Sequence, residues 1–272
     1  MLLSSGCAVH WVYNQLDWLI PWYARDYLDL NSEQKTWLKT RVGAHLDWHR
    51  RTQLPQYAAL LREMAVLVEN NSLSEADVVR ISNQINSLSE QIVTAAAPDL
   101  IQLFKGSDDK QLAKLFDKIE KDNKDFKKTY VDVTPDKQNE LELEQMRGFL
   151  KKWLGGLSSE QKALLEKWAQ EWKPLKADLY AEQLRWQADF RTCLSQRKSP
   201  EFDACMTKIL LGGEAFYSDT YRQKYQYNVQ LTNLLWLDVN RSLNAKQRKH
   251  AVQQLRDIAD ECTQLAAEAK SQ

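Results

Sequence analysis

The sequence of 272 residues contains few of the residues that build turns, since it has only eight glycines and six prolines. Folds made of strands and tight turns usually need more of both. Runs that favour β-strands are nearly absent. The one short example, residues 130–134, comes directly before Pro135 and is interpreted as a linker. The sequence therefore predicts an all-α fold.

The sequence also lacks net charge and long apolar runs. It has 37 basic and 37 acidic residues, which gives a formal net charge of zero. A balanced chain has no overall attraction to nucleic acid or to anionic lipid, so we expect no nucleic-acid partner. No stretch of about 20 apolar residues occurs, so no segment is predicted to span a bilayer.

Recognisable catalytic and metal-binding motifs are missing. There is no glycine-rich phosphate loop, no G-x-S-x-G turn and no CxxC pair. His45 and His49 are four residues apart, the spacing of two metal ligands on a helix, but no glutamate lies between them and no third ligand is obvious. We therefore expect no catalytic residue, no metal and no cofactor, and predict that the protein is not an enzyme.

What the sequence does contain is helical periodicity. Apolar residues recur at steps of three and four along almost the whole chain, and the hydrophobic fraction of 43% is enough for a sizeable core. These stripes predict a multi-helix bundle of about ten helices. Because the linker-like run lies near residue 130, one expected arrangement is two sub-bundles, with an N-terminal half at 8–129 and a C-terminal half at 136–272.

A short pattern recurs where three of these helices should begin. It reads Leu-Asn-Ser-Glu-Gln at 30–34, Leu-Ser-Ser-Glu-Gln at 157–161 and Leu-Asn-Ala-Lys-Gln at 243–247, with a looser version at 72–77. Asn or Ser caps the free amides, and Gln three residues later can reach back. The pattern resembles the Leu-Thr-x-x-Gln motif of Spy-type periplasmic chaperones, which are helical and bind unfolded clients. Any capped helix could also produce it.

The first seven residues, Met-Leu-Leu-Ser-Ser-Gly-Cys, resemble the end of a bacterial lipoprotein signal peptide. In such signals a diacylglycerol is attached to the cysteine and the chain is cut before it, which implies fatty acyl chains such as palmitate on Cys7. Lipoprotein signals usually place Leu three residues before the cysteine, where this sequence has Ser4. Residue 8 is Ala and not Asp, which by this resemblance implies an outer-membrane lipoprotein facing the periplasm. The alternative is an ordinary cysteine that is buried in the core.

A broader resemblance covers the first seventy residues and points to an uncharacterised family of lipoproteins from Gram-negative bacteria. It implies a membrane partner, reached through the lipid on Cys7, and names no activity. The residues that carry it are Leu16-Asp17-Trp18, Trp22-Tyr23, Asp26-Tyr27, Gln34, Trp48-His49-Arg50 and Leu54-Pro55-x-Tyr57.

Two of the four cysteines are placed so that they can form a disulfide. Cys193 and Cys205 are each six residues from Ser199, which with Pro200 resembles the start of a helix. In an antiparallel helix pair the two cysteines would lie nearly level. We expect a disulfide in an oxidising compartment, and two reduced, buried thiols otherwise. Cys262 is left over and is expected to be buried.

Two pairs of tryptophans, Trp18 with Trp22 and Trp168 with Trp172, are each spaced by four residues. Each pair should form an aromatic ridge on one helix. Core packing is the ordinary use of such a ridge. The alternative is an exposed interaction surface that holds an unfolded chain, a partner helix or an acyl chain.

Three hypotheses for function remain at this point. The first is a lipid-anchored periplasmic protein with a chaperone-like or scaffolding role, which binds client or partner proteins. The second is an envelope enzyme acting on peptidoglycan or lipid, which predicts a polar pocket with perturbed carboxylates. The third is an intracellular helical adaptor, which predicts free thiols at Cys193 and Cys205 and no acyl chain on Cys7.

Overall fold

The structure is a computed structural model that describes residues 5–269, with side chains described from residue 10 onwards. Within this range the chain forms twelve α-helices, one π-helical turn at Lys127–Val131 and one 3-10 turn at Gly213–Phe216, and no strand. The prediction of an all-α bundle is confirmed, with twelve helices in place of about ten. The α-helices are α1 (Ser5–Asn14), α2 (Leu16–Tyr27), α3 (Ser32–Thr52), α4 (Leu54–Glu69), α5 (Glu75–Lys105), α6 (Asp109–Phe126), α7 (Pro135–Leu154), α8 (Ser159–Glu171), α9 (Lys176–Ser195), α10 (Phe202–Leu211), α11 (Asp219–Arg241) and α12 (Ala245–Ala267).

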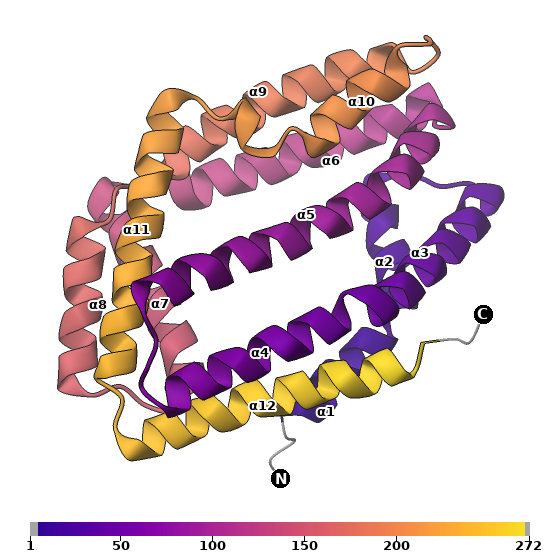
Figure 1. Ribbon diagram of the computed structural model, residues 1–272. Coiled ribbons are helices and arrows are strands. Elements are labelled where there is room, and N and C mark those ends of the chain that lie inside the picture. The colour runs from indigo at the N-terminus through magenta and orange to yellow at the C-terminus, as the bar shows by residue number, and fades with distance from the viewer. Residues whose placement is uncertain (1–4, 270–272) are drawn as a thin grey trace.

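The helices are arranged as a four-sided frame that α5 crosses (Figure 1). Along one edge lie α6, α9 and α10, and along the opposite edge lie α4 and α12. The sides are formed by α7, α8 and α11 at one end and by α2 and α3 at the other. With 31 residues, α5 is the longest helix and extends about 46 Å. It packs against α3, α10 and α11, so it connects three sides of the frame.

Helices from the two predicted halves pack against each other, so the boundary near residue 130 does not separate two bundles. The largest core cluster joins Leu28 and Phe104 from the first half with Phe190 and Phe202 from the second. Likewise, α12 lies along α4, and α10 and α11 contact α5. The linker-like run 130–134 begins in the last two residues of the π-helical turn and ends at Thr134, which caps α7. The halves interleave because each supplies helices whose apolar faces the other half covers.

The recurring Leu-x-x-x-Gln pattern marks helix starts, as predicted. Residues 31–34, 158–161 and 244–247 each form a capping box. In each box the side chain of the first residue accepts from the backbone N–H of the Gln, and the Gln side chain accepts from the backbone N–H of the first residue. Ser74 and Asp77 form the looser version. A further capping box at 108–111 was not predicted, because no leucine precedes its Asp108.

The capping glutamines also join the helices in pairs. Gln161 and Gln247 donate to each other's side-chain oxygens at 3.0 and 2.9 Å, which ties the start of α8 to the start of α12. Gln34 and Gln111 do the same for α3 and α6, at 3.3 and 2.6 Å. Each glutamine therefore satisfies its own helix start and that of a helix distant in sequence, which fixes how these ends meet.

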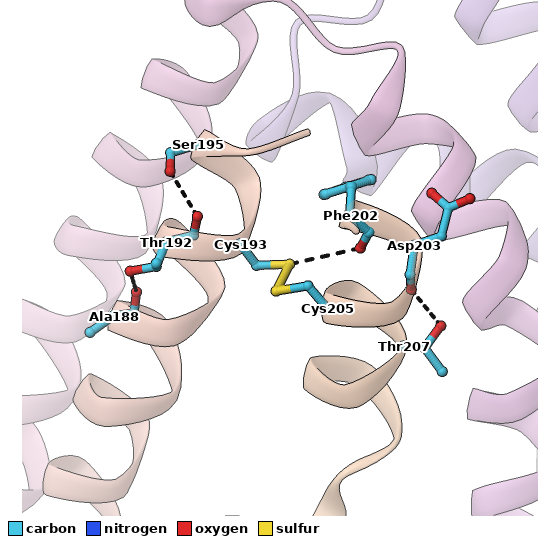
Figure 2. Close-up of a disulfide and its surroundings, with 8 residues drawn as sticks. All are labelled: Ala188, Thr192, Cys193, Ser195, Phe202, Asp203, Cys205 and Thr207. Carbon is cyan, nitrogen blue, oxygen red and sulfur yellow. Dashed lines mark hydrogen bonds between the residues drawn. A yellow bond between two sulfur atoms is a disulfide. The ribbon is translucent and has the colours of Figure 1, made fainter. Parts of the chain in front are cut away.

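Cys193 of α9 and Cys205 of α10 are joined in a disulfide, with Cα atoms 6.0 Å apart (Figure 2). The chain reverses between these helices, as expected for the disulfide. However, α10 begins at Phe202 and not at Pro200, and Ser199 lies in the turn. The fully buried Phe202 ring explains the later start, because the turn has to place it in the core. Cys262 is a free, buried thiol, and burial raises its pKa.

Candidate apolar binding site

An apolar pocket opens between the helices α4, α5, α7, α11 and α12. Its volume is ≈330 Å³, which is in the range of natural ligand pockets. Every lining residue except Ser82 and Asn240 has an apolar side chain. The lining residues are Met64, Val68, Leu73, Val78, Ile81, Ser82, Ile85, Phe149, Leu150, Trp153, Leu154, Trp236, Val239, Asn240, Leu243, Ala251 and Leu255.

The mouth of the pocket carries exposed apolar side chains. Phe149 of α7 is 48% exposed and Ile85 of α5 is 45% exposed. The Phe149 ring lies 6.0 Å from the Trp153 ring and 5.7 Å from the Trp236 ring, between centroids. Three aromatic rings from two helices therefore gather at one rim, where they can contact an apolar ligand from the side.

The floor of the pocket is part of the hydrophobic core. Leu150, Leu154 and Val239 are buried in one core cluster, and Leu255 is buried in the cluster next to it. The helical spacing of Phe149, Leu150, Trp153 and Leu154 explains this division, because neighbouring positions on one helix face point to the mouth and to the floor. A ligand that entered from the rim would meet a preformed apolar surface.

The polar groups at one end of the pocket are engaged with one another. The Asn240 side-chain amide donates to Asn71 at 3.2 Å, and Arg248 donates to Asn71 at 3.0 Å and to the Asn240 carbonyl oxygen at 3.0 Å. Arg248 also donates to the carbonyl oxygen of Val68. These bonds fix the α4–α5 turn against α11 and α12, and they keep the guanidinium directed at protein oxygens.

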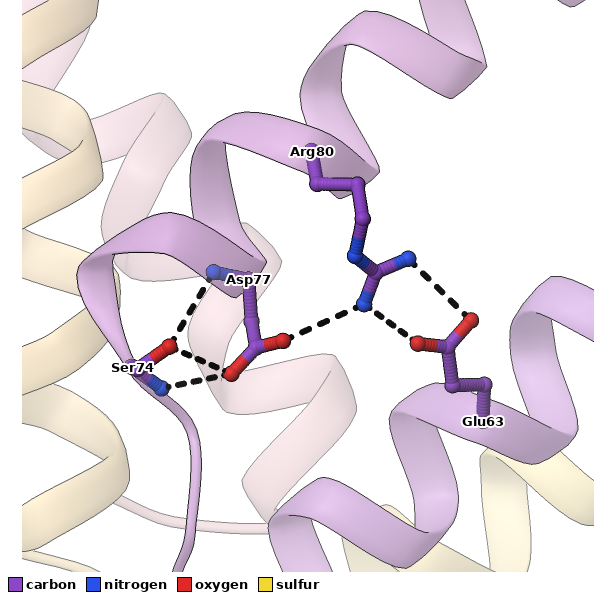
Figure 3. Close-up of polar contacts among 4 residues, drawn as sticks. All are labelled: Glu63, Ser74, Asp77 and Arg80. Carbon is purple, nitrogen blue, oxygen red and sulfur yellow. Dashed lines mark hydrogen bonds and ion pairs between the residues drawn. The ribbon is translucent and has the colours of Figure 1, made fainter.

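The walls formed by α4 and α5 are also linked on the solvent side, beside the pocket residues Met64 and Ile81. Arg80 of α5 donates to Glu63 of α4 and to Asp77 (Figure 3). Hydrogen bonds from Ser74 and Arg80 lower the pKa of the Asp77 carboxyl. Glu63 and Arg80 are exposed, so their ion pair fixes the position of α4 relative to α5 more than it stabilises the protein.

A second cavity, of ≈610 Å³, lies among α6, α9 and the segment before α11, and is more polar. Most of its polar side chains already bond to other groups of the protein. The buried Glu182 carboxylate accepts from the backbone and hydroxyl of Ser218, at the start of α11, and pairs with Arg185. Asn123 and Gln187 bond to each other at 2.7 and 3.0 Å. These side chains hold helices together, which leaves them poorly placed for acid–base chemistry.

The model of a family of unknown function, DUF6279, matches residues 26–222. This chain belongs to that family. No curated protein and no solved structure matches the chain. The DUF6279 match runs from the end of α2 to the start of α11. It therefore includes the pocket walls from α4, α5 and α7, while the walls from α11 and α12 lie beyond it.

The two tryptophan pairs predicted as a candidate interaction surface differ in the structure. Trp18 and Trp22 are 57% and 47% exposed, with rings stacked 6.1 Å apart. For Trp168 the surface prediction is wrong, and Trp172 is partly buried. Trp168 is 4% exposed and its indole nitrogen donates to Thr232 at 3.2 Å, and Trp172 packs against the same core cluster. The facing helix α11 covers this ridge, whereas nothing in the described chain covers Trp18 and Trp22.

The remaining predicted residues are placed as follows. The backbone of Cys7 lies in α1, and its side chain is outside the described side chains. His45 lies 2.6 Å from an oxygen of Asp99, while His49 lies 2.9 Å from the Tyr13 hydroxyl. Among the described residues, no group of three or more His, Cys, Asp or Glu could hold a metal ion. In this part of the chain no helix is long and apolar enough to cross a membrane.

Sequence reasoning missed the aromatic rim of the pocket. The spacing of Phe149 and Trp153 is four residues, the same signal that singled out the tryptophan pairs. That signal places two rings on one helix face but does not tell whether the face is covered. The decisive third ring, Trp236, is 83 residues further along the chain than Trp153, and only the packing of α7 on α11 brings it near.

Proposed function

We propose that this chain is a lipid-anchored helical protein of the outer membrane, facing the periplasm, that binds an apolar segment of a client or partner protein in the five-helix pocket. The single observation behind the binding proposal is an apolar floor with an exposed aromatic rim. Burial of apolar surface drives this kind of association. The apolar face of an amphipathic helix is the natural occupant of such a pocket.

The proposed anchor is a lipid on Cys7. It is supported by the signal-like residues 1–7 and by the resemblance of residues 16–57 to Gram-negative lipoproteins. The resemblance of the Leu-x-x-x-Gln pattern to Spy-type chaperones supports a chaperone-like form of the binding role. Several acyl chains on one cysteine would hold the protein stably, since each buried CH₂ contributes about 0.8 kcal/mol.

An envelope enzyme would need a reactive polar group facing a cavity. The strongest candidate, Glu182, is engaged by Ser218 and Arg185, so the observations favour binding over catalysis. An intracellular adaptor would have reduced thiols at Cys193 and Cys205, and the close approach of these two cysteines favours an oxidising compartment instead.

The substitution Phe149→Glu tests the binding proposal, because it places a carboxylate at the pocket mouth. The expected result is about a tenfold loss in the ability to keep reduced, unfolded lysozyme from aggregating, since an apolar ligand would have to desolvate the charge. The midpoint of thermal unfolding should stay unchanged, because Phe149 is half-exposed. Light scattering and circular dichroism measure the two quantities.

The matched control is Leu184→Glu, which puts the same charge on a side chain of α9 that is 42% exposed and outside the pocket. This variant should suppress aggregation as well as the parent protein. Equal activity of the Phe149 variant and the parent would show that the pocket does not bind the client.

The anchor is tested separately, by the intact mass of protein expressed in a Gram-negative host from the gene with its upstream sequence. Cleavage before Cys7 with added acyl groups is expected, and Cys7→Ser should abolish both. An unmodified chain in the cytoplasm would rule out the anchor and make the intracellular adaptor the leading hypothesis.

A further inference from the structure

Helix α2 is apolar but has no buried residue. Its twelve residues read LDWLIPWYARDY, and none of them falls in the buried class. Trp18, Ile20, Trp22 and Tyr23 are all exposed, and Trp11 and Val12 of α1 are exposed just before them. So many large apolar side chains in one short segment are unusual for a surface that faces only water.

The exposure does not come from loose attachment of these helices. The Tyr27 hydroxyl at the end of α2 donates to Asp122 of α6 at 3.0 Å, and Lys114 of α6 donates to the carbonyl oxygen of Arg25 at 2.8 Å. The next residue, Leu28, is buried in the largest core cluster. Helix α2 is therefore fixed to the frame by its C-terminal end.

Helix α1 is attached in the same way through its polar side. His10 lies 3.2 Å from Glu261 and 2.9 Å from Glu268, both on or just after α12. Asn14 donates to Glu268 and accepts from Arg50. These contacts hold the segment so that Trp11 and Val12 stay directed at solvent.

We infer that the aromatic face of α1 and α2 rests in the lipid–water interface of a membrane, with Trp18, Trp22 and Tyr23 as its central contacts. Tryptophan and tyrosine have an apolar body and one polar group, which suits the headgroup region. The seven residues from Trp18 to Ala24 carry no charge, far short of the roughly 20 apolar residues that cross a bilayer, so the segment lies on the surface.

The size and charge of the face favour lipid over a second copy of the chain. One aromatic side chain can bury about 150–250 Å² of surface. The exposed parts of the aromatic side chains on this face therefore present on the order of 600 Å² in total. A stable protein interface needs about 800 Å² from each partner. The charges on α2, Asp17, Arg25 and Asp26, together with those of α6 that lie beside it, Lys114, Lys118 and Asp122, sum to zero, so we expect binding to zwitterionic lipid without a need for anionic lipid.

The test uses the full chain with Cys7→Ser, so that no acyl chain contributes and the result is independent of the proposed function. Its partition into phosphatidylcholine vesicles is measured by sedimentation, with and without 30% phosphatidylglycerol. When Trp18→Ala and Trp22→Ala are added to this chain, it should bind the vesicles at least about tenfold more weakly, since tryptophan supplies most of the interfacial affinity. Binding should not depend on phosphatidylglycerol or on salt.

The control is Leu184→Ala/Leu234→Ala, which removes two similarly exposed apolar side chains outside both this face and the pocket and should partition like the parent. Circular dichroism checks that all variants are folded, and Trp18→Phe/Trp22→Phe keeps the apolar bulk and should retain part of the binding. Absence of vesicle binding overturns the inference. A dimer that the Trp18/Trp22 variant abolishes, seen by analytical ultracentrifugation without vesicle binding, would assign the face to a second copy instead.

Discussion

At the scale of single residues, His49 shows how burial among neighbours sets the behaviour of a titrating group. Its ring lies 5.7 Å from the ring of Tyr13 and 5.7 Å from that of Tyr57, and its Nδ1 contacts the Tyr13 hydroxyl. Burial, with a smaller contribution from the charge of Arg50, lowers the pKa of His49. Burial also raises the pKa of Tyr13 to about 12, so its hydroxyl keeps its proton.

These shifts predict a loss of stability in mild acid. An unfolded chain protonates His49 near pH 6.5, while the folded protein resists protonation until lower pH. The free energy of unfolding should therefore fall as pH drops through about 6.5. His49→Asn, which keeps a group near the Tyr13 hydroxyl, should show a smaller fall between pH 7 and pH 5 in urea unfolding. His10, His45 and His250 are present in both proteins, so their contributions cancel in the comparison. Parallel pH profiles of the two proteins would contradict this account.

Individual residues also mark the limit of what the sequence can predict. Helix caps such as Asn31 and Ser158 could be predicted, because a cap acts within four residues of itself. Whether an aromatic ridge is buried or exposed could not be predicted, since Trp18 and Trp168 belong to pairs with the same spacing and differ in exposure. What decides between them is a helix elsewhere in the chain: α11 covers Trp168, and no helix of the described chain covers Trp18.

At the scale of helices, the paired capping glutamines join elements that the sequence separates. Gln161 is fully buried and bonds to Gln247 and Ser242, as well as to the backbone of Ser158. A local motif that also makes a tertiary contact aligns two helix ends more strictly than apolar packing can, because hydrogen bonds are directional. The partner of each glutamine was not predictable, since every capping box looks alike in sequence.

The substitution Gln161→Ala should lower the free energy of unfolding by about 2–3 kcal/mol, since it removes the acceptor of the Ser158 amide, the donor to the Ser242 carbonyl oxygen and both hydrogen bonds to Gln247. Gln247→Ala should cost a similar amount. In the double variant the loss in free energy of unfolding should be smaller than the sum of the two single losses by at least about 1 kcal/mol, because the two glutamines share one pair of hydrogen bonds. Urea unfolding measures each value, with the exposed Gln253→Ala as a control near zero. Strict additivity would mean that the two caps act independently.

At the scale of the whole molecule, the all-α class was predictable, whereas the packing of the two halves against each other was not. Helical periodicity is present along almost the whole sequence. The contacts between α4 and α12 or between α5 and α10 join segments about one to two hundred residues apart, and no local pattern records them. The pocket shares this origin, since Met64 and Ala251 line the same space.

Helix α12 should be indispensable for the fold. A variant that ends at Leu243 lacks the partner of α4, whose Ala58 and Ala65 are buried in clusters with α12, and lacks one wall of the pocket. We expect it to lose cooperative thermal unfolding and to bind the dye ANS strongly, as loosely packed proteins do. A synthetic peptide of residues 244–269 should reverse part of the dye binding. A sharp transition in the truncated protein would contradict this expectation.

The contact of α1 with α12 limits how early the fold can be completed during synthesis. His10 and Asn14 find their partners on Glu261 and Glu268, about 250 residues later in the chain. At a synthesis rate of about 5–20 residues per second, the first helix waits roughly 10–50 s for the last to be made. During that interval α1 lacks these partners, although helices α2 to α6 can already contact one another. Until α12 has been made, α4 also lacks the helix that covers Ala58 and Ala65, so we expect this edge of the frame to fold last.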